Sequence, residues 1–170
     1  GIPQVSGDFA DSEELAVLIA KRIGYPVVMK IVSPDILHKS DVGGICLNLN
    51  SDESIKLAYR KMMSEIGTKN PLAHLEGVLV EKMAPKGQEV IIGMQRDPGF
   101  GAMMMFGLGG IFVELFKDVS FRVAPLTRSD AYAMIENTRA GKLLTGYRGQ
   151  APADVNAVVE TILRLSQLSV

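Results

Sequence analysis

A short apolar segment that contains a single lysine is the sequence feature that most restricts how this chain can fold. Residues 27–32 are apolar except for Lys30, and the dipeptide Tyr25-Pro26 precedes them. A continuous apolar run of this length is typical of a buried β-strand. An ammonium group in such a strand costs several kcal/mol unless it meets an anion. The sequence therefore leaves two interpretations: Lys30 binds a nucleotide phosphate, or it lies at an edge and extends its side chain to water.

The remaining pattern predicts a mixture of helices and strands around this segment. Apolar residues at helical spacing, with cap residues before them, predict helices over 12–23, 51–67, 129–137 and 154–168. Alternating or short continuous apolar runs predict strands over 27–32, 45–49, 77–84, 89–95, 102–106 and 119–124. The order helix, strand, loop, strand, helix, followed by further strands and helices, predicts an α+β fold.

Composition excludes several classes of protein. The chain has 170 residues, of which 47% are hydrophobic, so a packed core is expected and general disorder is excluded. The 18 basic and 19 acidic residues give a formal charge of −1, which excludes a dedicated nucleic-acid binder because phosphate runs require an excess of clustered cations. No apolar stretch is long enough for a membrane helix. The single Cys46 cannot form an intramolecular disulfide, so we expect a reducing compartment, by default the cytoplasm.

His38 lies in the loop SPDILHKSDVGG, between two expected strands. Neutral imidazole is a good nucleophile at pH 7, and a phosphate transferred to it keeps a high transfer potential. His38 is therefore a candidate phosphohistidine, and Gly43 and Gly44 would let its loop hinge. The local sequence alone favours the alternative, a loop histidine hydrogen-bonded to backbone, and this is our interpretation of His74.

Two further segments could contact a nucleotide. The residues Glu81, Lys82 and Met83, with Glu89 beyond a Pro-Lys-Gly break, form either a hinge that meets a flat purine or a plain hairpin. The glycine-rich turn 107–110 leaves backbone N–H groups free to approach phosphate, or it is a tight turn beside packed backbone.

Two carboxylates and an arginine follow the glycine-rich turn. Glu114 and Asp118 could reach a divalent cation. Arg122 alternates within an expected strand, where it either faces phosphate or belongs to an exposed strand face.

Taken together, these segments resemble one enzyme family. GYPVVMK, SPDILHKSDVGG, VEKMAPKGQE, FGLGGIFVELFKDVSFRVAPL and GKLLTGYRGQAPAD are similar to the ATP-grasp domain of ADP-forming acyl-CoA synthetases, of the acetate–CoA ligase β-subunit type. The resemblance covers nearly the whole chain. It implies two α+β lobes that hold ATP or ADP between them, here expected over 1–80 and 81–170.

The resemblance also assigns roles to individual residues. It implies that His38 is the second phosphohistidine of the family, on a swinging loop, and that Glu81 to Met83 lie at the adenine hinge. Glu114 resembles the first metal carboxylate, with Asp118 as a less certain metal neighbour. The residues expected to bind nucleotide are Lys30, Glu81, Lys82, Met83, Glu89, Gly109, Gly110 and Arg122.

The implied activity is the reversible conversion of acyl-CoA, ADP and phosphate into acid, CoA and ATP. The cofactors would be ATP or ADP and Mg²⁺, and the partner would be a CoA-binding α subunit or domain that carries the first phosphohistidine and brings acyl-CoA and phosphate. The alternative is a regulatory nucleotide-binding module of a multidomain protein acetyltransferase; His38 favours the enzyme. A relative of biotin carboxylase or succinyl-CoA ligase is a third, weaker hypothesis.

The sequence departs from the family pattern at both ends. Such chains usually continue into a strand with an Asp-x-Asn metal motif and have a helix before the segment that begins here at Gly1, so we expect truncation at both ends. The letters of that motif recur in Asp154-Val155-Asn156, but they lie at an expected helix start. We therefore expect these three residues to have no metal role.

Overall fold

The computed structural model describes residues 1–110, 118–149 and 151–169 and divides the chain into two compact units. One unit comprises Gln4–Pro85, and the other comprises Lys86–Val170 together with Gly1–Pro3. The boundary that we expected between residues 80 and 81 lies within a strand, Gly77–Lys82.

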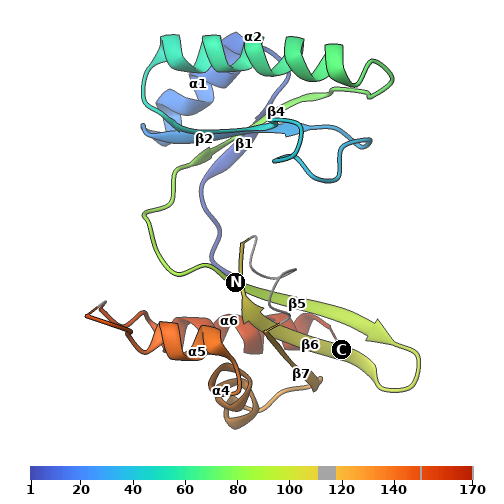
Figure 1. Cartoon of the computed structure of the whole chain (residues 1–170), viewed down its shortest axis with the longest axis vertical. Helices are drawn as coiled ribbons and strands as arrows, with labels where there is room; N and C mark the ends of the chain where they lie inside the picture. The colour runs from blue at the N-terminus through green and yellow to red at the C-terminus, as the bar shows by residue number, and fades with distance from the viewer. Residues whose placement is uncertain (111–117, 150, 170) are drawn as a thin grey trace. The chain divides into compact units, whose positions relative to one another are not determined.

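The unit Gln4–Pro85 is an antiparallel sheet covered by two helices (Figure 1). Its strands are β1 (Gly7–Ala10), β2 (Val27–Val32), β3 (Ile45–Leu49) and β4 (Gly77–Lys82), in the spatial order β1–β4–β2–β3. The helices α1 (Glu13–Ile23) and α2 (Asp52–Lys69) lie on the same side of this sheet. Alternate strand residues face them and form the core with helix residues; these include Met29, Ile31, Val78, Val80, Ile19, Ile55, Met62 and Ile66.

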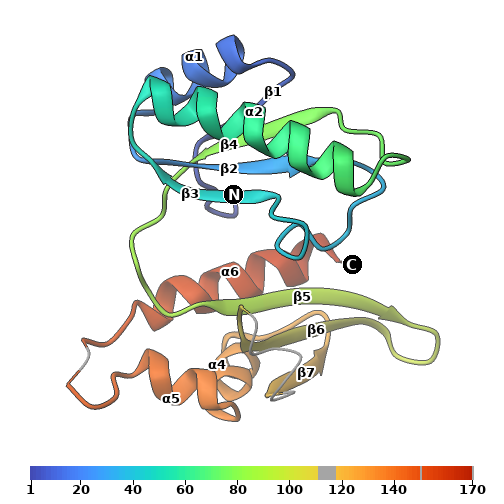
Figure 2. The ribbon, with the colours of Figure 1, turned by 45° about the horizontal axis from the view of Figure 1, so that its top comes forward.

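The second unit is an antiparallel sheet in the order β5–β6–β7 with three described helices. Its strands are β5 (Val90–Asp97), β6 (Gly101–Leu108) and β7 (Val119–Val123); β5 and β6 form a long hairpin (Figure 2). The helices are α4 (Arg128–Glu136), α5 (Arg139–Leu144) and α6 (Val155–Leu168). Their apolar residues pack with strand residues in a separate core that includes Met104, Phe106, Leu108, Met134, Ile135, Leu144, Val159 and Ile162. Gly1 joins this unit because its carbonyl oxygen accepts a hydrogen bond from the Arg164 guanidinium.

The α+β fold is confirmed, and most element boundaries fall within two residues of the expected ones. Among the elements of the described residues, β1 and α5 were not expected. One expectation at the glycine-rich turn was wrong: Gly107 belongs to β6, where it pairs with Val119. Glycine is needed at this position because a side chain would collide with the backbone of Asp118.

Candidate functional site

Lys30 and Glu81 form an ion pair on the face of the first sheet that α1 and α2 do not cover. Lys30 lies opposite Leu79 in the β2–β4 register, and Glu81 lies opposite Val28. Both residues alternate with core residues, so their side chains point away from the helices. The side chain of Lys30 is 38% exposed, and that of Glu81 is 17% exposed. The charge of Lys30 is therefore paired with a carboxylate of the same chain, on a sheet face where both side chains remain partly exposed.

Lys82 and Met83, the other expected hinge residues, form hydrogen bonds with backbone groups of the first unit. The Lys82 ammonium donates to the carbonyl oxygens of Gly24 and Tyr25, at 2.8 and 3.0 Å, directly after the end of α1. The backbone N–H of Lys82 donates to Ser6 O at 2.8 Å, and that of Met83 donates to Pro26 O at 3.1 Å. The Lys82 ammonium is thus a helix C-terminal partner, which is a favourable place for a cation.

The loop that carries His38 is anchored at both ends. Ile36 is only 7% exposed and packs in the first core, and Gly44 O accepts a hydrogen bond from Ile31 N at 2.8 Å. A Cβ at Gly44 would overlap the Ile31 side chain, so this position requires glycine. Asp35 ties the loop to the segment before β4, because Asp35 Oδ2 accepts from His74 N at 2.7 Å.

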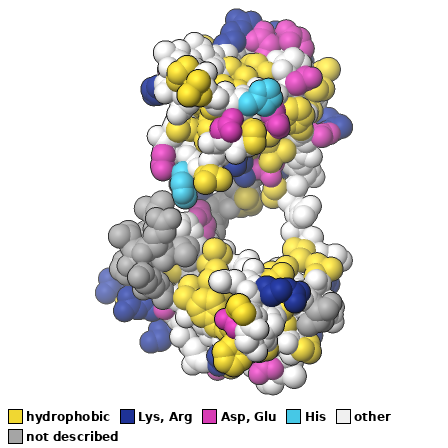
Figure 3. All heavy atoms as spheres, turned by 90° about the vertical axis from the view of Figure 1, so that its right-hand side faces the viewer, with side chains coloured by type: hydrophobic (Ala, Val, Ile, Leu, Met, Phe, Trp, Pro, Cys, Tyr) yellow, Lys and Arg dark blue, Asp and Glu magenta, His cyan; other side chains and the backbone are white. Residues whose placement is uncertain are grey.

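His38 itself is exposed between these anchors. Both histidines of the chain are visible at the surface in the space-filling view (Figure 3). The backbone carbonyl of His38 accepts a hydrogen bond from Asp41 N at 3.2 Å, and Gly44 N donates to Lys39 O at 2.7 Å. A turn held from its own backbone therefore presents an imidazole that solvent and a second molecule can reach.

Glu89, Gly109 and Gly110 come together in the second unit. Gly109 N donates to Glu89 O at 2.9 Å, and a Cβ at Gly110 would lie 2.5 Å from Glu89 Oε2. Gly110 has a φ of +66°, a conformation that favours glycine. Three residues that we expected at the nucleotide are thus neighbours, although the N–H of Gly109 is already engaged.

Asp118 accepts hydrogen bonds from backbone N–H groups at the N-terminus of α5. Its Oδ2 accepts from Arg139 N at 2.8 Å and from Ala140 N at 3.2 Å. This is the usual way in which a carboxylate satisfies free N–H groups at a helix start. Glu114, the expected first metal carboxylate, lies outside the described residues.

Arg122 lies on the face of the second sheet that packs against the helices of that unit. It lies opposite the buried Met104 in the β6–β7 register, and its Nη1 donates to Phe121 O at 2.8 Å. The pKa of Asp130 lies below its usual value, chiefly because the Thr127 hydroxyl and backbone N–H donate to it, and Arg122 adds an attraction. Arg122 therefore contributes to the field at the N-terminus of α4.

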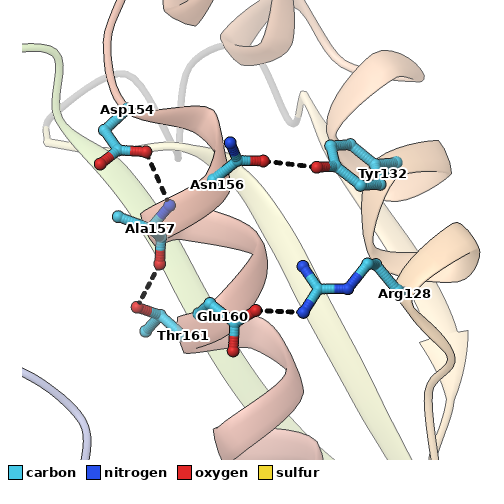
Figure 4. A network of polar contacts seen from close by, with 7 residues as sticks. All are labelled: Arg128, Tyr132, Asp154, Asn156, Ala157, Glu160 and Thr161. Carbon is cyan, nitrogen blue, oxygen red and sulfur yellow. Dashed lines mark hydrogen bonds and ion pairs between the residues drawn. The ribbon is translucent and has the colours of Figure 1, made fainter.

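Asp154 and Asn156, the residues that resemble the metal motif, form hydrogen bonds within α6 and between α6 and α4 (Figure 4). Asp154 is the N-cap of α6, and its Oδ1 accepts from Ala157 N at 2.9 Å. Asn156 Oδ1 accepts from the Tyr132 hydroxyl at 2.5 Å, and Glu160 pairs with Arg128 one turn later. These contacts join α4 to α6.

Within the ranges 1–110, 118–149 and 151–169, no three His, Cys, Asp or Glu side chains gather as metal ligands. None of the described helices is both long enough and apolar enough to cross a membrane.

Sequence reasoning missed the contributions of Gly7 and Asp35. Gly7 is the residue opposite Glu81 in β1, and a Cβ there would lie 2.7 Å from Glu81 Cγ. The pattern gave no signal for Gly7, because the need for glycine arises only from the pairing of β1 with β4. Asp35 lies in the same loop as His38, which could have drawn attention to it. Its hydrogen-bond partner, His74, lies 39 residues away and could not be identified from the sequence.

Comparison with known proteins places the chain in a family. A family model described as an ATP-grasp domain matches residues 1–170. The β subunit of acetate–CoA ligase [ADP-forming] I from Pyrococcus furiosus is 50% identical over 169 residues, which cover 99% of this chain and 73% of the subunit. Acetate–CoA ligase [ADP-forming] I from Archaeoglobus fulgidus is 51% identical over 151 residues, or 89% of this chain and 22% of that protein.

Solved structures agree with the sequence relatives. Dinucleotide-forming acetyl-coenzyme A synthetase 1 from Ca. Korarchaeum cryptofilum, in complex with coenzyme A and Ca-AMPCP, matches with a TM-score of 0.95 at 51% identity, over 99% of this chain and 73% of that one. Structures of the same enzyme with a phosphorylated phosphohistidine segment and with Mg-AMPPCP match with TM-scores of 0.88 and 0.84, at 49% and 48% identity, over 99% of this chain and 73% and 72% of theirs. The chain therefore belongs to the ATP-grasp domain family, and it is similar to the β subunits of ADP-forming acetate–CoA ligases. It spans about a fifth of the A. fulgidus protein.

Proposed function

We propose that this chain is the nucleotide-binding and phosphoryl-transfer part of an ADP-forming acid–CoA ligase of the acetate–CoA ligase type. His38 would receive phosphate from a histidine of a CoA-binding partner subunit or domain and pass it to ADP. The observation that carries the proposal is the exposed imidazole of His38 on a loop anchored by buried residues, in a chain about half identical to such ligases. The free thiol of Cys46 suits a reducing compartment, which supports a cytoplasmic location.

The transfer step requires few groups from the protein. An oxygen of the terminal phosphate of ADP attacks the phosphorus on His38, the P–N bond breaks, and the imidazole takes up a proton as ATP forms. Such a step depends on positioning and charge neutralisation. Lys30 supplies a cation on the open face of its sheet, and its place in the family pattern supports contact with the nucleotide phosphates.

Glu81, Met83, Glu89, Gly109 and Gly110 are proposed to line the nucleotide site. The proximity of Glu89 to the two glycines supports this grouping. For Lys82 and Arg122, whose cationic groups bind backbone carbonyls, any contact with nucleotide would come through the backbone or through a change of partner.

Mg²⁺ fits the donor set as a weakly held ion. It usually binds through one or two carboxylates, with phosphate oxygens and water completing the octahedron, so a protein cluster of three ligands is not required. Asp118 and Glu114 are the proposed carboxylates, although one oxygen of Asp118 already accepts two N–H groups. When bound, Mg²⁺ would neutralise phosphate charge.

Intact-mass measurement after incubation with ATP and Mg²⁺ tests the relay. We expect an acid-labile adduct of one phosphate on the parent protein and on His74→Ala, and none on His38→Ala. His74→Ala is a matched control because its side chain is also exposed and its backbone N–H, which binds Asp35, is kept. An adduct on His38→Ala, or one that survives acid, would contradict the assignment.

A further inference from the structure

The ion pair of Lys30 and Glu81 is built into the sheet rather than formed by two free surface side chains. The two residues lie on neighbouring strands and on the same face, with Glu81 two residues along β4 from Leu79, the residue opposite Lys30. Glu81 is on β4, which is hydrogen-bonded to β1 on one side and β2 on the other. The backbone of both partners is therefore fixed by the ladder.

Gly7 makes room for the Glu81 side chain on the β1 side. A Cβ at this position would lie 2.7 Å from Glu81 Cγ and 3.1 Å from Val80 O. Any other residue would push the carboxylate away from its observed place. The sequence of β1 thus determines where the Glu81 carboxylate lies.

The carboxylate also depends on the lysine. Among the described residues, the buried Glu81 Oε2 has no hydrogen-bond partner, and its contact with a cation is the ion pair with Lys30. A buried carboxylate oxygen that loses its only cation is strongly destabilised. A phosphate that drew the Lys30 ammonium away from Glu81 would have to overcome that cost.

From this we propose that Glu81 is a positioning residue: it keeps the Lys30 ammonium in place while the remaining N–H groups of that ammonium donate to the phosphates of a bound nucleoside diphosphate or triphosphate. An ammonium has three N–H donors, so one can stay with the carboxylate. The inference rests on the proposed function, in which Lys30 meets phosphate. It goes beyond the expected hinge role, in which backbone groups meet the purine, because it assigns a role to the Glu81 carboxylate, which contacts the lysine.

Binding of ADP and of adenosine by calorimetry separates these roles. We expect Glu81→Gln and Gly7→Ala to weaken ADP binding about three- to tenfold and to leave adenosine binding within about twofold, since only ADP contacts the ammonium. Gly7→Ala keeps every charge and only displaces the carboxylate. Gly67→Ala, on α2 with no close neighbour for the added methyl group, is the matched control and should bind both ligands like the parent.

Several outcomes would overturn the inference. Unchanged or tighter ADP binding in both Glu81→Gln and Gly7→Ala would make Glu81 a competitor for the lysine or a bystander. An equal loss for adenosine would return Glu81 to the purine. Lys30→Ala separates this inference from the proposed function: if ADP binding is unchanged in Lys30→Ala, the phosphate role of Lys30 fails; if it is weakened there but not in the other two variants, only the positioning role fails.

Labelling of lysines with acetic anhydride tests the ion pair without any nucleotide. We expect Lys30 to react several-fold faster in Glu81→Gln than in the parent, because the Lys30 nitrogen is then no longer engaged by the carboxylate. Lys82, whose ammonium is held by two carbonyl groups, is the internal reference and should keep its rate. An unchanged rate at Lys30, read by peptide mass spectrometry, would show that the pair does not hold the ammonium in solution.

Discussion

Tyr25 illustrates how a single side chain can join three elements. It lies between α1 and β2, and its hydroxyl donates to Oδ1 of Asp52, the first residue of α2, at 2.9 Å. Lys21 of α1 holds the other oxygen of Asp52 at 2.5 Å. These two partners lower the pKa of Asp52, with Lys21 as the larger cause. Burial, followed by the contact with Asp52, raises the pKa of Tyr25 to about 12.

The raised pKa of Tyr25 predicts a loss of stability at alkaline pH. An unfolded tyrosine ionises near pH 10, so the folded protein keeps this proton over a range in which the unfolded chain releases it. The free energy of unfolding therefore falls as pH rises from about 10 to about 12. Urea unfolding at pH 9 and pH 11 should show a smaller decrease for Tyr25→Phe than for the parent. Equal decreases would mean that Tyr25 titrates like a free tyrosine.

Two helices of the first unit begin at serines with different contacts. Ser51 precedes α2 and forms a capping box: its hydroxyl oxygen accepts from Ser54 N at 3.1 Å, and Ser54 Oγ accepts from Ser51 N at 3.1 Å. Ser12 precedes α1 and makes no side-chain cap hydrogen bond. Both helices were predicted from sequence, but the difference between their caps was not.

Replacing each serine by alanine should separate the cap from the residue type. Ser51→Ala removes the acceptor for Ser54 N and should lower the free energy of unfolding by about 1 kcal/mol. Ser12→Ala is the matched change without a cap bond and should cost only a few tenths of that amount. Chemical denaturation of the two variants gives both values, and equal losses would mean that the Ser51 hydroxyl contributes nothing specific.

The elements that sequence reasoning missed depend on contacts from distant residues. The sequence of β1, Gly-Asp-Phe-Ala, has little intrinsic strand preference, and it is extended because β4 pairs with it. The six-residue helix α5 contains Gly141 and starts on the carboxylate of Asp118, 21 residues earlier. Lys30 and His38 could be identified as candidates from residue chemistry alone. The pairing of Lys30 with Glu81 could not be identified in this way. It depends on the register between β2 and β4, which are neighbours in the sheet but are not consecutive in the sequence.

At the scale of the whole molecule, the described residues form two separate hydrophobic cores. One lies within Gln4–Pro85, and the other lies in the unit completed by Lys86–Val170. The first includes a complete four-stranded ladder with both of its helices, all within residues 7–82. A unit with its own hydrophobic core is expected to fold by itself.

Expression of residues 4–85 alone should therefore give a folded protein with a cooperative thermal transition by circular dichroism. The matched fragment 4–80, which ends at the boundary expected from sequence, should melt at a lower temperature. It lacks the end of β4, including Lys82, whose N–H and ammonium bind Ser6, Gly24 and Tyr25. Equal melting temperatures would show that these contacts contribute little to the unit.

The exposure of His38 has a consequence for the lifetime of any phosphate it carries. A phosphoimidazole on an open turn is in contact with bulk water, so spontaneous hydrolysis competes with delivery to ADP. Under the proposed relay, the phosphate would be transferred only when the acceptor arrives before water reacts. The same openness makes the modified residue accessible to an antibody or a phosphatase without unfolding, so the phosphorylated fraction could be followed directly in a working cell extract.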